Sequence, residues 1–175
     1  ELPEILIAKS DPIGVIWVGT SAGLFRLDRG RLILERVNDP VLNGLSPEFL
    51  AFGYSQDGNR VYLASEHKLY VLQDGVLRKI HSGRVGNRIH ALLLATDRRL
   101  WIGSNDGLHY MAGDQVPQAV PALAQVRISA LYQASNGGIW IGTAKDGIFR
   151  IDDDGSPRLL PLPETGEHAP WIYDI

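Results

Sequence analysis

Nine polar residues of this chain stand in short segments where several of them could meet and bind a ligand. They are Glu66, His67, Lys68, Arg88, Asn105, Asp106, Arg127, Lys145 and Asp146. The set combines carboxylates, cations, an imidazole and an amide, and a few convergent groups of this kind typically orient a small molecule in a pocket. The hypothesis is therefore a binding site, set against the simpler interpretation that these residues are polar because their loops face water.

Catalysis finds little support in the sequence. The phosphate-binding pattern G-x-x-x-x-G-K-[ST] does not occur. The letters of the nucleophile pattern G-x-S-x-G occur once, at Gly19–Gly23, but a strand (Leu24–Leu27) is expected to follow there, whereas a nucleophile elbow leads into a helix. The chain has no cysteine, which excludes disulfides, thiolate metal sites and cysteine nucleophiles. An acid–base reaction would need a convergent acid and base, and the candidate trio is His67, Asp106 and Asp146. We predict no catalytic residue in this chain.

The sequence also indicates neither a metal nor a cofactor. The five histidines never pair at H-x-x-x-H spacing, so a metal site would have to be assembled from separate parts of the fold. The acidic run Asp152–Asp154 before Gly155 is better explained as a solvated turn than as a calcium loop. A calcium loop closes with a glutamate, but Glu164 stands at the wrong distance and Pro157 and Pro161 intervene.

The composition narrows the range of partners. The 175 residues are 45% hydrophobic and 21% charged, with a net charge of −3, which is ordinary for a soluble globular domain. Nucleic acid is not expected as a partner, because it would need a basic face. No apolar run approaches the roughly 20 residues of a membrane span, so we expect contact with a membrane only through segments outside this chain. The start at Glu1 shows no basic and then apolar leader, so any signal peptide is expected to be absent or already removed. Because the first residue is not Met, we expect the chain to be a piece of a longer protein.

The elements that must position the nine polar residues come from an internal repeat. Four segments align on an aromatic residue, and their sequences are IWVGTSAGLFRL, VYLASEHKLYVL, LWIGSNDGLHYM and IWIGTAKDGIFRI. The aromatic residues are Trp17, Tyr62, Trp101 and Trp140, with spacings of 45, 39 and 39. A period near 40 with several short strands in each unit is typical of a β-propeller rather than of a helical array.

Each unit follows one plan of four short strands. An apolar run leads into an Asx turn, in which the side chain bonds the backbone two residues on. These turns are expected at Asp11, Asp57, Asp97 and Asn136. The aromatic strand, a loop and a third strand follow, and a glycine turn then leads to a weaker fourth strand. The glycine turns are expected at Gly30, Gly75, Gly113 and Gly155. The predicted fold class is all-β, with four complete four-stranded antiparallel propeller blades.

The predicted blades span about residues 1–38, 46–82, 87–118 and 126–163, and residues 171–175 look like the first strand of a fifth. Two interpretations of this end stay open. The favoured one is a fragment of a larger propeller, and the other is that the last strand closes a ring onto the first blade. An open arc would expose two apolar blade faces, so self-association through them is expected.

The recurring Trp-x-Gly-Thr motif has an explanation in packing. Trp17 and Gly19 project from the same face of a strand, and a large ring beside a vacant position lets the next blade approach closely. Blade two departs from the pattern with Tyr62, Ala64 and Lys68, so we expect its loop to have a different shape, since lysine adopts positive φ less readily than glycine. The most recognisable residues are therefore core residues, and function is expected in the variable loops.

The units resemble the two-component regulator propeller repeat. The segments LLATDRRLWIGSNDGLHY and YQASNGGIWIGTAKDGIF carry the resemblance, because they share Trp-Ile-Gly-[Ser/Thr] and a following glycine and aromatic or histidine in register. The resemblance implies a sensor module on the periplasmic or extracellular side of the bacterial inner membrane. The output part, a histidine kinase or a diguanylate cyclase, would lie outside these residues. The family motif is structural and implies no catalytic residue.

The propeller plan also places the candidate site. Loops between the second and third strands gather at one end of a propeller, together with the connections between blades. The nine polar residues would therefore ring the mouth of a central channel and meet an unknown small ligand or a protein. Two alternatives stay open: an interaction scaffold that uses Glu66, Lys68 and the insert Asn38–Pro47, or a small propeller enzyme such as a lyase.

Overall fold

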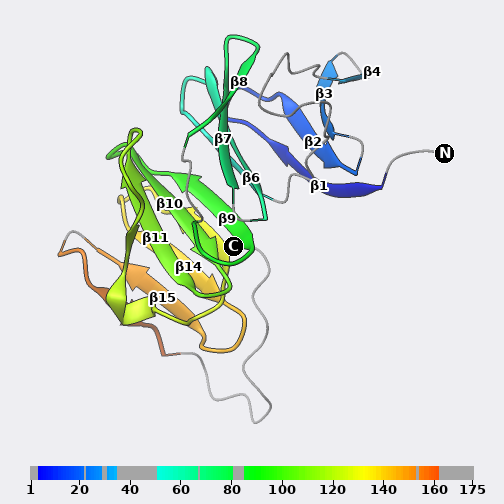
Figure 1. Cartoon of the computed structure of the whole chain (residues 1–175). Coiled ribbons are helices and arrows are strands. Elements are labelled where there is room, and N and C mark those ends of the chain that lie inside the picture. Colours follow the sequence, from blue (N-terminus) through cyan, green and yellow to red (C-terminus); the bar gives the residue numbers. More distant parts are fainter. Residues whose placement is uncertain are drawn as a thin grey trace. The chain divides into compact units, whose positions relative to one another are not determined.

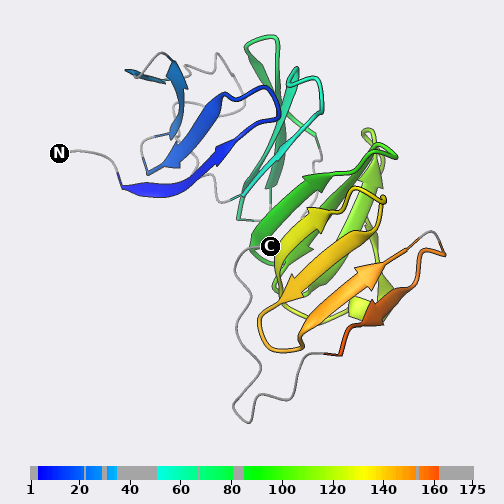
Figure 2. The same ribbon diagram turned by 180° about the vertical axis from the view of Figure 1, so that it is seen from behind.

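Four antiparallel sheets make up the part of the chain that the computed structural model describes, which is residues 4–21, 23–28, 31–34, 51–66, 68–80, 85–152 and 154–161. Each sheet has four strands, and successive strands are hydrogen-bonded neighbours. The contacts divide the chain into two compact units, residues 1–85 and 86–175, with two sheets in each (Figures 1 and 2). The prediction of an all-β chain with four complete four-stranded blades is confirmed.

The first unit contains blades one and two. Blade one consists of β1 (Ile5–Ser10), β2 (Ile16–Thr20), β3 (Gly23–Asp28) and β4 (Arg31–Leu34). Blade two consists of β5 (Ala51–Tyr54), β6 (Arg60–Ser65), β7 (Lys68–Gln73) and β8 (Val76–Lys79). Trp17 and Leu24 of blade one share a buried cluster with Phe52, Leu63 and Tyr70 of blade two. The apolar faces of the two blades therefore bury one another, as adjacent propeller blades require.

The second unit contains blades three and four. Blade three consists of β9 (Ile89–Leu94), β10 (Arg99–Ser104), β11 (Gly107–Ala112) and β12 (Gln118–Ala119). Blade four consists of β13 (Ile128–Gln133), β14 (Ile139–Thr143), β15 (Ile148–Ile151) and β16 (Pro157–Leu159). A 3-10 helix, η1 (Pro121–Leu123), lies in the connection between them, and its Leu123 is fully buried in the shared core. This helix was not expected from the repeat.

The four Asx turns form as predicted. In each, the side-chain oxygen accepts a hydrogen bond of 2.9 to 3.2 Å from the backbone N–H two residues on. The acceptor and donor residues are Asp11 and Ile13, Asp57 and Asn59, Asp97 and Arg99, and Asn136 and Gly138. Asp11 makes two further bonds. Its Oδ1 also accepts from the N–H of Val15 at 2.9 Å, and its Oδ2 accepts from the indole N–H of Trp17 at 3.0 Å.

Blades three and four pack through the vacant position that the repeat leaves beside its tryptophan. A Cβ atom added to Gly103 would lie 2.5 Å from Cγ2 of Ile128, which is the fully buried first residue of β13. Strand β13 in turn packs against β9 and β10, so any side chain at position 103 would push the two blades apart. The explanation of Trp-x-Gly as a motif for close approach is confirmed at this interface.

The turn between β6 and β7 of blade two differs from its counterparts, as expected. Glycine with positive φ begins the third strand in blades one and three, at Gly23 (φ 125°) and Gly107 (φ 136°). In blade two that place is taken by Lys68, and the positive φ moves to Glu66, at 47°. In blade two, the residue with positive φ therefore lies two positions before the start of the third strand.

Several expectations concern residues outside the described ranges. They include the turn at Gly30, the insert Asn38–Pro47, His67 and the fifth-blade strand Trp171–Ile175. The expectations of self-association and of a larger or closed ring depend on these residues and on neighbouring blades. All of them stay predictions.

Candidate functional site

One tight turn of blade three organises the loop end of the second unit. The turn contains Asn105 and Asp106, between β10 and β11. The N–H of Asn105 donates to the carbonyl of Asn87 at 2.9 Å, and the N–H of Gln125 donates to the carbonyl of Asp106 at 3.0 Å. Asn87 belongs to the connection that enters β9, and Gln125 belongs to the connection that enters β13. Two blade connections and one second-to-third-strand turn are thus held together, as the propeller plan predicts.

The Asp106 carboxylate holds this junction in place. Its Oδ1 accepts hydrogen bonds from the N–H of Asn87 and the hydroxyl of Ser104, both at 2.8 Å. Burial raises the pKa of Asp106, but these hydrogen bonds outweigh it and lower the pKa below its usual value. A Cβ atom added to Gly86 would lie 2.9 Å from the same oxygen, so glycine there lets the connection come this close. Asp106 is an ionised structural anchor.

His90, on β9, contacts this turn through Asn105 and is half-buried. Its Nε2 donates to Oδ1 of Asn105 at 2.7 Å. Burial lowers the pKa of His90, and the charges of Arg127 and Arg88 lower it further against the opposing hydrogen bond with Asn105. The lowered pKa favours the neutral imidazole at pH 7, and the positive charges of both guanidinium groups contribute to lowering it. His90 was not among the residues predicted from the sequence, although it stands two positions after Arg88.

Two arginines occupy equivalent places beside His90. Arg88 directly precedes β9 and Arg127 directly precedes β13, within the repeated sequences RIHAL and RISAL. Both side chains are exposed. Arg88 has a φ of 51°, which is an uncommon conformation for a residue with a side chain. The carbonyl of Arg127 accepts from the N–H of Ala144 at 3.0 Å, so the entry to β13 is joined to the next turn of blade four.

That turn carries two more of the predicted residues, Lys145 and Asp146, both exposed. The N–H of Asp146 donates to the hydroxyl of Thr143 at 2.8 Å, which fixes the turn. The second unit therefore brings Arg88, Asn105, Asp106, Arg127, Lys145 and Asp146 to the same end of its two blades. Glu66 and Lys68 lie at the β6–β7 turn of the first unit, and His67 lies outside the described residues.

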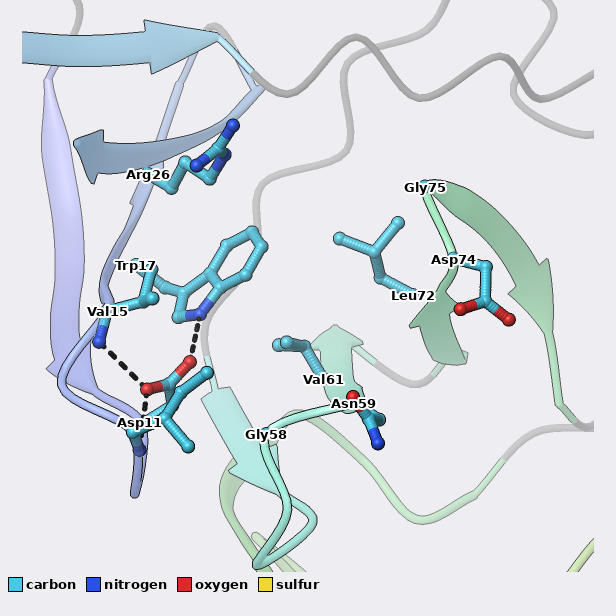
Figure 3. Close-up of a pocket in the computed structure, with 11 residues that line it drawn as sticks. Asp11, Val15, Trp17, Arg26, Gly58, Asn59, Val61, Leu72, Asp74 and Gly75 are labelled. Atoms are coloured by element: carbon cyan, nitrogen blue, oxygen red, sulfur yellow. Dashed lines mark hydrogen bonds between the residues drawn. The ribbon is translucent and has the colours of Figure 1, made fainter.

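The first unit contains a cleft that the sequence analysis did not predict (Figure 3). Its volume is about 410 Å³, within the usual size of small-molecule sites. It opens at the turns that join first to second and third to fourth strands, so it lies at the opposite end of these blades from the β2–β3 and β6–β7 turns. The residues that line it include Asp11, Trp17, Arg26, Asn59, Leu72 and Asp74.

Metal binding has no candidate group in the part of the chain that the structure describes. There, no three His, Asp or Glu side chains come together in a way that could hold an ion. Asp152 instead pairs with Arg150 at 2.7 Å, and Asp154 pairs with Arg158 and accepts from the N–H of Ser156. Among the described residues, no helix has the length and apolar character needed to cross a membrane.

Comparison with known families gives one match. Residues 122–145 match the family model described as two component regulator propeller. The chain carries a two-component regulator propeller repeat. The matched residues run from η1 through β13 and β14 of blade four, including Trp140 and the Trp-x-Gly-Thr motif. The resemblance seen in the sequence is thereby confirmed. No curated protein sequence matches the chain.

Solved structures of β-propellers are similar to this repeat-bearing chain. The extracellular domain of BT4673 from B. thetaiotaomicron, described as a one component system, has a TM-score of 0.76 at 18% identity, over 99% of this chain and 24% of that one. The extracellular domain of BT3049 from the same organism, described as a hybrid two component system, has a TM-score of 0.66 at 21% identity, over 90% and 23%. This chain thus spans about a quarter of each of these relatives.

An enzyme has a similar fold. Virginiamycin B lyase from Staphylococcus aureus has a TM-score of 0.69 at 15% identity, over 94% of this chain and 58% of that chain. At such identities the likeness establishes the propeller fold and nothing about the chemistry. The two-component regulator propeller repeat is therefore the more specific finding.

Proposed function

We propose that this chain is part of the extracytoplasmic sensor propeller of a bacterial signal-transduction receptor, and that it receives a small acidic ligand at the loop end of its second unit. The repeat at residues 122–145 supports the sensor role. The two similar extracellular domains, described as one component and hybrid two component systems, support the location outside the cytoplasm. The signalling output would lie elsewhere in the full-length protein.

The placement of Arg88 and Arg127 is the observation that carries the ligand proposal. The two arginines flank neutral His90 at the entries to neighbouring strands, and Lys145 adds a third exposed cation on the adjoining turn. Arginine pairs well with carboxylates and phosphates because its guanidinium donates two parallel hydrogen bonds. Two carboxylates, those of Asp106 and Asp146, lie at the same end, and that of Asp106 accepts hydrogen bonds from the N–H of Asn87 and the hydroxyl of Ser104.

Calorimetric titration of the chain with phosphate, succinate, citrate and neutral glycerol tests the proposed site. We expect saturable binding of at least one anion and none of glycerol. Replacing Arg88 or Arg127 by alanine should weaken that binding about tenfold, because a charge-assisted hydrogen bond contributes on the order of 1.5–3 kcal/mol. Arg78→Ala is the control, since Arg78 is an exposed arginine of β8 in the first unit. Equal binding by the Arg88→Ala and Arg127→Ala double variant would reject the site, and silence toward all anions would favour the protein scaffold.

We further propose that the chain binds its ligand without transforming it. Asp106, one member of the candidate catalytic trio, has a lowered pKa and two hydrogen bonds within the fold, so it is a poor proton acceptor or donor near neutral pH. Incubation of a bound ligand with the chain, followed by mass spectrometry, should return the ligand unchanged. A product whose formation is lost in Asp106→Asn would establish the lyase alternative instead.

The sensor role is tested in the full-length protein. The gene that contains this chain should also encode a membrane-spanning segment and a signalling domain. A full-length gene with neither would contradict the sensor role while leaving the loop-end binding site open to the calorimetric test.

A further inference from the structure

We propose that His90 is a third ligand-binding residue at the loop end of the second unit, and that it takes up a proton when an acidic ligand binds there. The site therefore binds its ligand more tightly in acidic than in neutral solution. This inference deepens the proposed function and rests on it, because it requires an anion beside Arg88 and Arg127.

His90 has its position because of a β-bulge in the first strand of blade three. The register of β9 against β10 passes from Ile89 to Ala91, so His90 is the extra residue between them. Bulges are frequent next to functional sites, where they re-aim a side chain. The same bulge occurs in blades one and four, at Leu6 and Ser129. Leu6 is apolar, and the hydroxyl of Ser129 donates to a carbonyl of its own sheet at 3.1 Å. Of these three bulges, that of blade three alone presents a side chain that can bind a proton.

The hydrogen bond to Asn105 determines which nitrogen of His90 takes up the proton. Nε2 lies 2.7 Å from Oδ1 of Asn105, and an amide oxygen only accepts, so Nε2 carries the hydrogen of the neutral ring. Nδ1 is then the basic nitrogen, and it has no hydrogen-bond partner among the described residues. Protonation turns Nδ1 into a donor for an acidic ligand, while the bond to Asn105 stays in place.

The charges around His90 couple its protonation to the binding of an anion. Arg88 stands two residues before His90, and Arg127 directly precedes β13, which packs against β9. Burial and both guanidinium charges hold the pKa of His90 below its usual value. An anion that pairs with these groups places a negative charge near the ring, which raises the pKa again. Because such coupling is reciprocal, protonation of the ring strengthens binding of the anion by the same factor.

Four other described residues at this end of the second unit are titratable. Asp106 lies on the β10–β11 turn, His109 lies on β11, and Lys145 and Asp146 lie on the β14–β15 turn. Among these residue types, only histidine ordinarily changes its charge between pH 5 and 8. His109 is therefore the matched control for His90, and its Nδ1 is buried, without a partner among the described residues.

Calorimetric titration with sulfate tests the inference, because sulfate stays fully ionised between pH 5.5 and 7.5. At constant ionic strength we expect about fivefold tighter binding at pH 5.5 than at pH 7.5. His90→Gln keeps a donor for Asn105 but cannot titrate, so it should bind sulfate equally well at both pH values. His109→Gln should keep the pH dependence of the unchanged chain.

The outcomes separate this inference from the proposed site. Equal affinities for sulfate at the two pH values in the unchanged chain, or an undiminished pH dependence in His90→Gln, would overturn the inference and leave the anion site in place. Silence toward sulfate at both pH values would also overturn it, and silence toward phosphate, succinate and citrate as well would reject the site itself.

A second measurement needs no ligand. The imidazole signals of His90 in nuclear magnetic resonance report its pKa, which we expect to rise in Arg88→Ala and in Arg127→Ala because each variant removes one positive charge. Arg78→Ala, at an exposed position of β8 in the first unit, should leave the pKa of His90 unchanged. An unmoved pKa in both Arg88→Ala and Arg127→Ala would overturn the inference.

Discussion

Trp17 of blade one and Trp101 of blade three hold the same position in the repeat, but their indole groups are in different environments. The indole N–H of Trp17 donates to Asp11 at 3.0 Å. Nε1 of Trp101 is buried and, within the described residues, has no hydrogen-bond partner. Both rings are less than 10% exposed. The indole N–H of the repeated tryptophan therefore has a hydrogen-bond acceptor in the first unit and, among the described residues, none in the second.

The difference comes from the position of the acidic residue in the preceding turn. Asp11 and Ala95 are equivalent, because the N–H of each donates at 2.9 Å to the carbonyl four residues on, of Val15 and Arg99 respectively. Asp97, the Asx residue of blade three, stands two residues later and bonds the N–H of Arg99. A shift of two residues decides whether a turn carboxylate faces the core or the solvent.

Replacement of Asp11 by alanine should give the largest effect on this comparison. The change leaves three donors without their acceptor, those of Ile13, Val15 and Trp17, and we expect the free energy of unfolding to fall by about 3 kcal/mol. Chemical denaturation monitored by tryptophan fluorescence measures it. The matched control is Asp97→Ala, whose carboxylate is half exposed and should cost less than about 1 kcal/mol. Equal losses in the two variants would contradict the comparison.

The second prediction concerns the interface between blades three and four. Gly103→Ala places a Cβ atom 2.5 Å from Cγ2 of Ile128, and we expect overpacking to cost about 1–3 kcal/mol of unfolding free energy. Denaturation of the single and double variants with Ile128→Ala measures the coupling. Ile128→Ala removes the clashing methyl group, so the double variant should be more stable than the sum of the two single changes predicts. Strict additivity would show that this contact does not set the approach of the blades.

The third prediction concerns how the unfolding free energy depends on pH through His90 of the second unit. The pKa of His90 is lowered in the folded protein, so the unfolded chain binds more protons once the pH drops below the ordinary histidine pKa of about 6.5. Stability from neutral His90 is present above that pH and is lost as the pH falls below it. His90→Gln keeps a donor for Asn105 but cannot titrate, so its unfolding free energy should fall less between pH 7.5 and 5.5. Parallel pH profiles of the two proteins would contradict this.

The smallest effect is expected from Ala95→Asp, which transfers the arrangement of blade one to blade three. The new carboxylate should accept from the indole N–H of Trp101, as Asp11 does from Trp17. The unfolding free energy should change by less than about 1 kcal/mol, because the hydrogen bonds gained offset the burial of a charge. The informative measurement is the indole N–H resonance of Trp101, which should move downfield. An unmoved resonance would show that the two turns differ in more than the acidic residue.

Much of the fold was predictable because the same short-range interactions recur in each of the four blades. Asx residues at the turns bond the backbone two residues on in all four blades, and glycine beside tryptophan admits the neighbouring blade at Gly103. The helix η1 was missed because its residues, Pro121–Leu123, belong to a connection where no repeat guides the prediction.

That the Asn105–Asp106 turn meets the two blade connections of the second unit was predictable, whereas the binding site at a channel mouth stays a prediction. The hydrogen bonds join the Asn105–Asp106 turn to both blade connections, as expected from the propeller plan. The role of Asp106 as a structural anchor and the bond between His90 and Asn105 were not predictable, because each depends on a partner 15 or 19 residues away in the chain. The cleft of the first unit was missed for the same reason, since residues of two blades line it.

The sequence by itself determined the number of blades, the order of their strands and the positions of their turns, because these follow from short-range patterns of aromatic, glycine and Asx residues. Only the tertiary structure decided which distant polar groups bond to one another and where the surface between two blades is hollowed. The close approach of Ile128 to Gly103, the bond between Asn87 and Asp106 and the cleft that residues of blades one and two line all depend on contacts between distant segments, whereas the bond of Trp17 to Asp11 is local. Such distant contacts are not specified by the short-range pattern of the repeat.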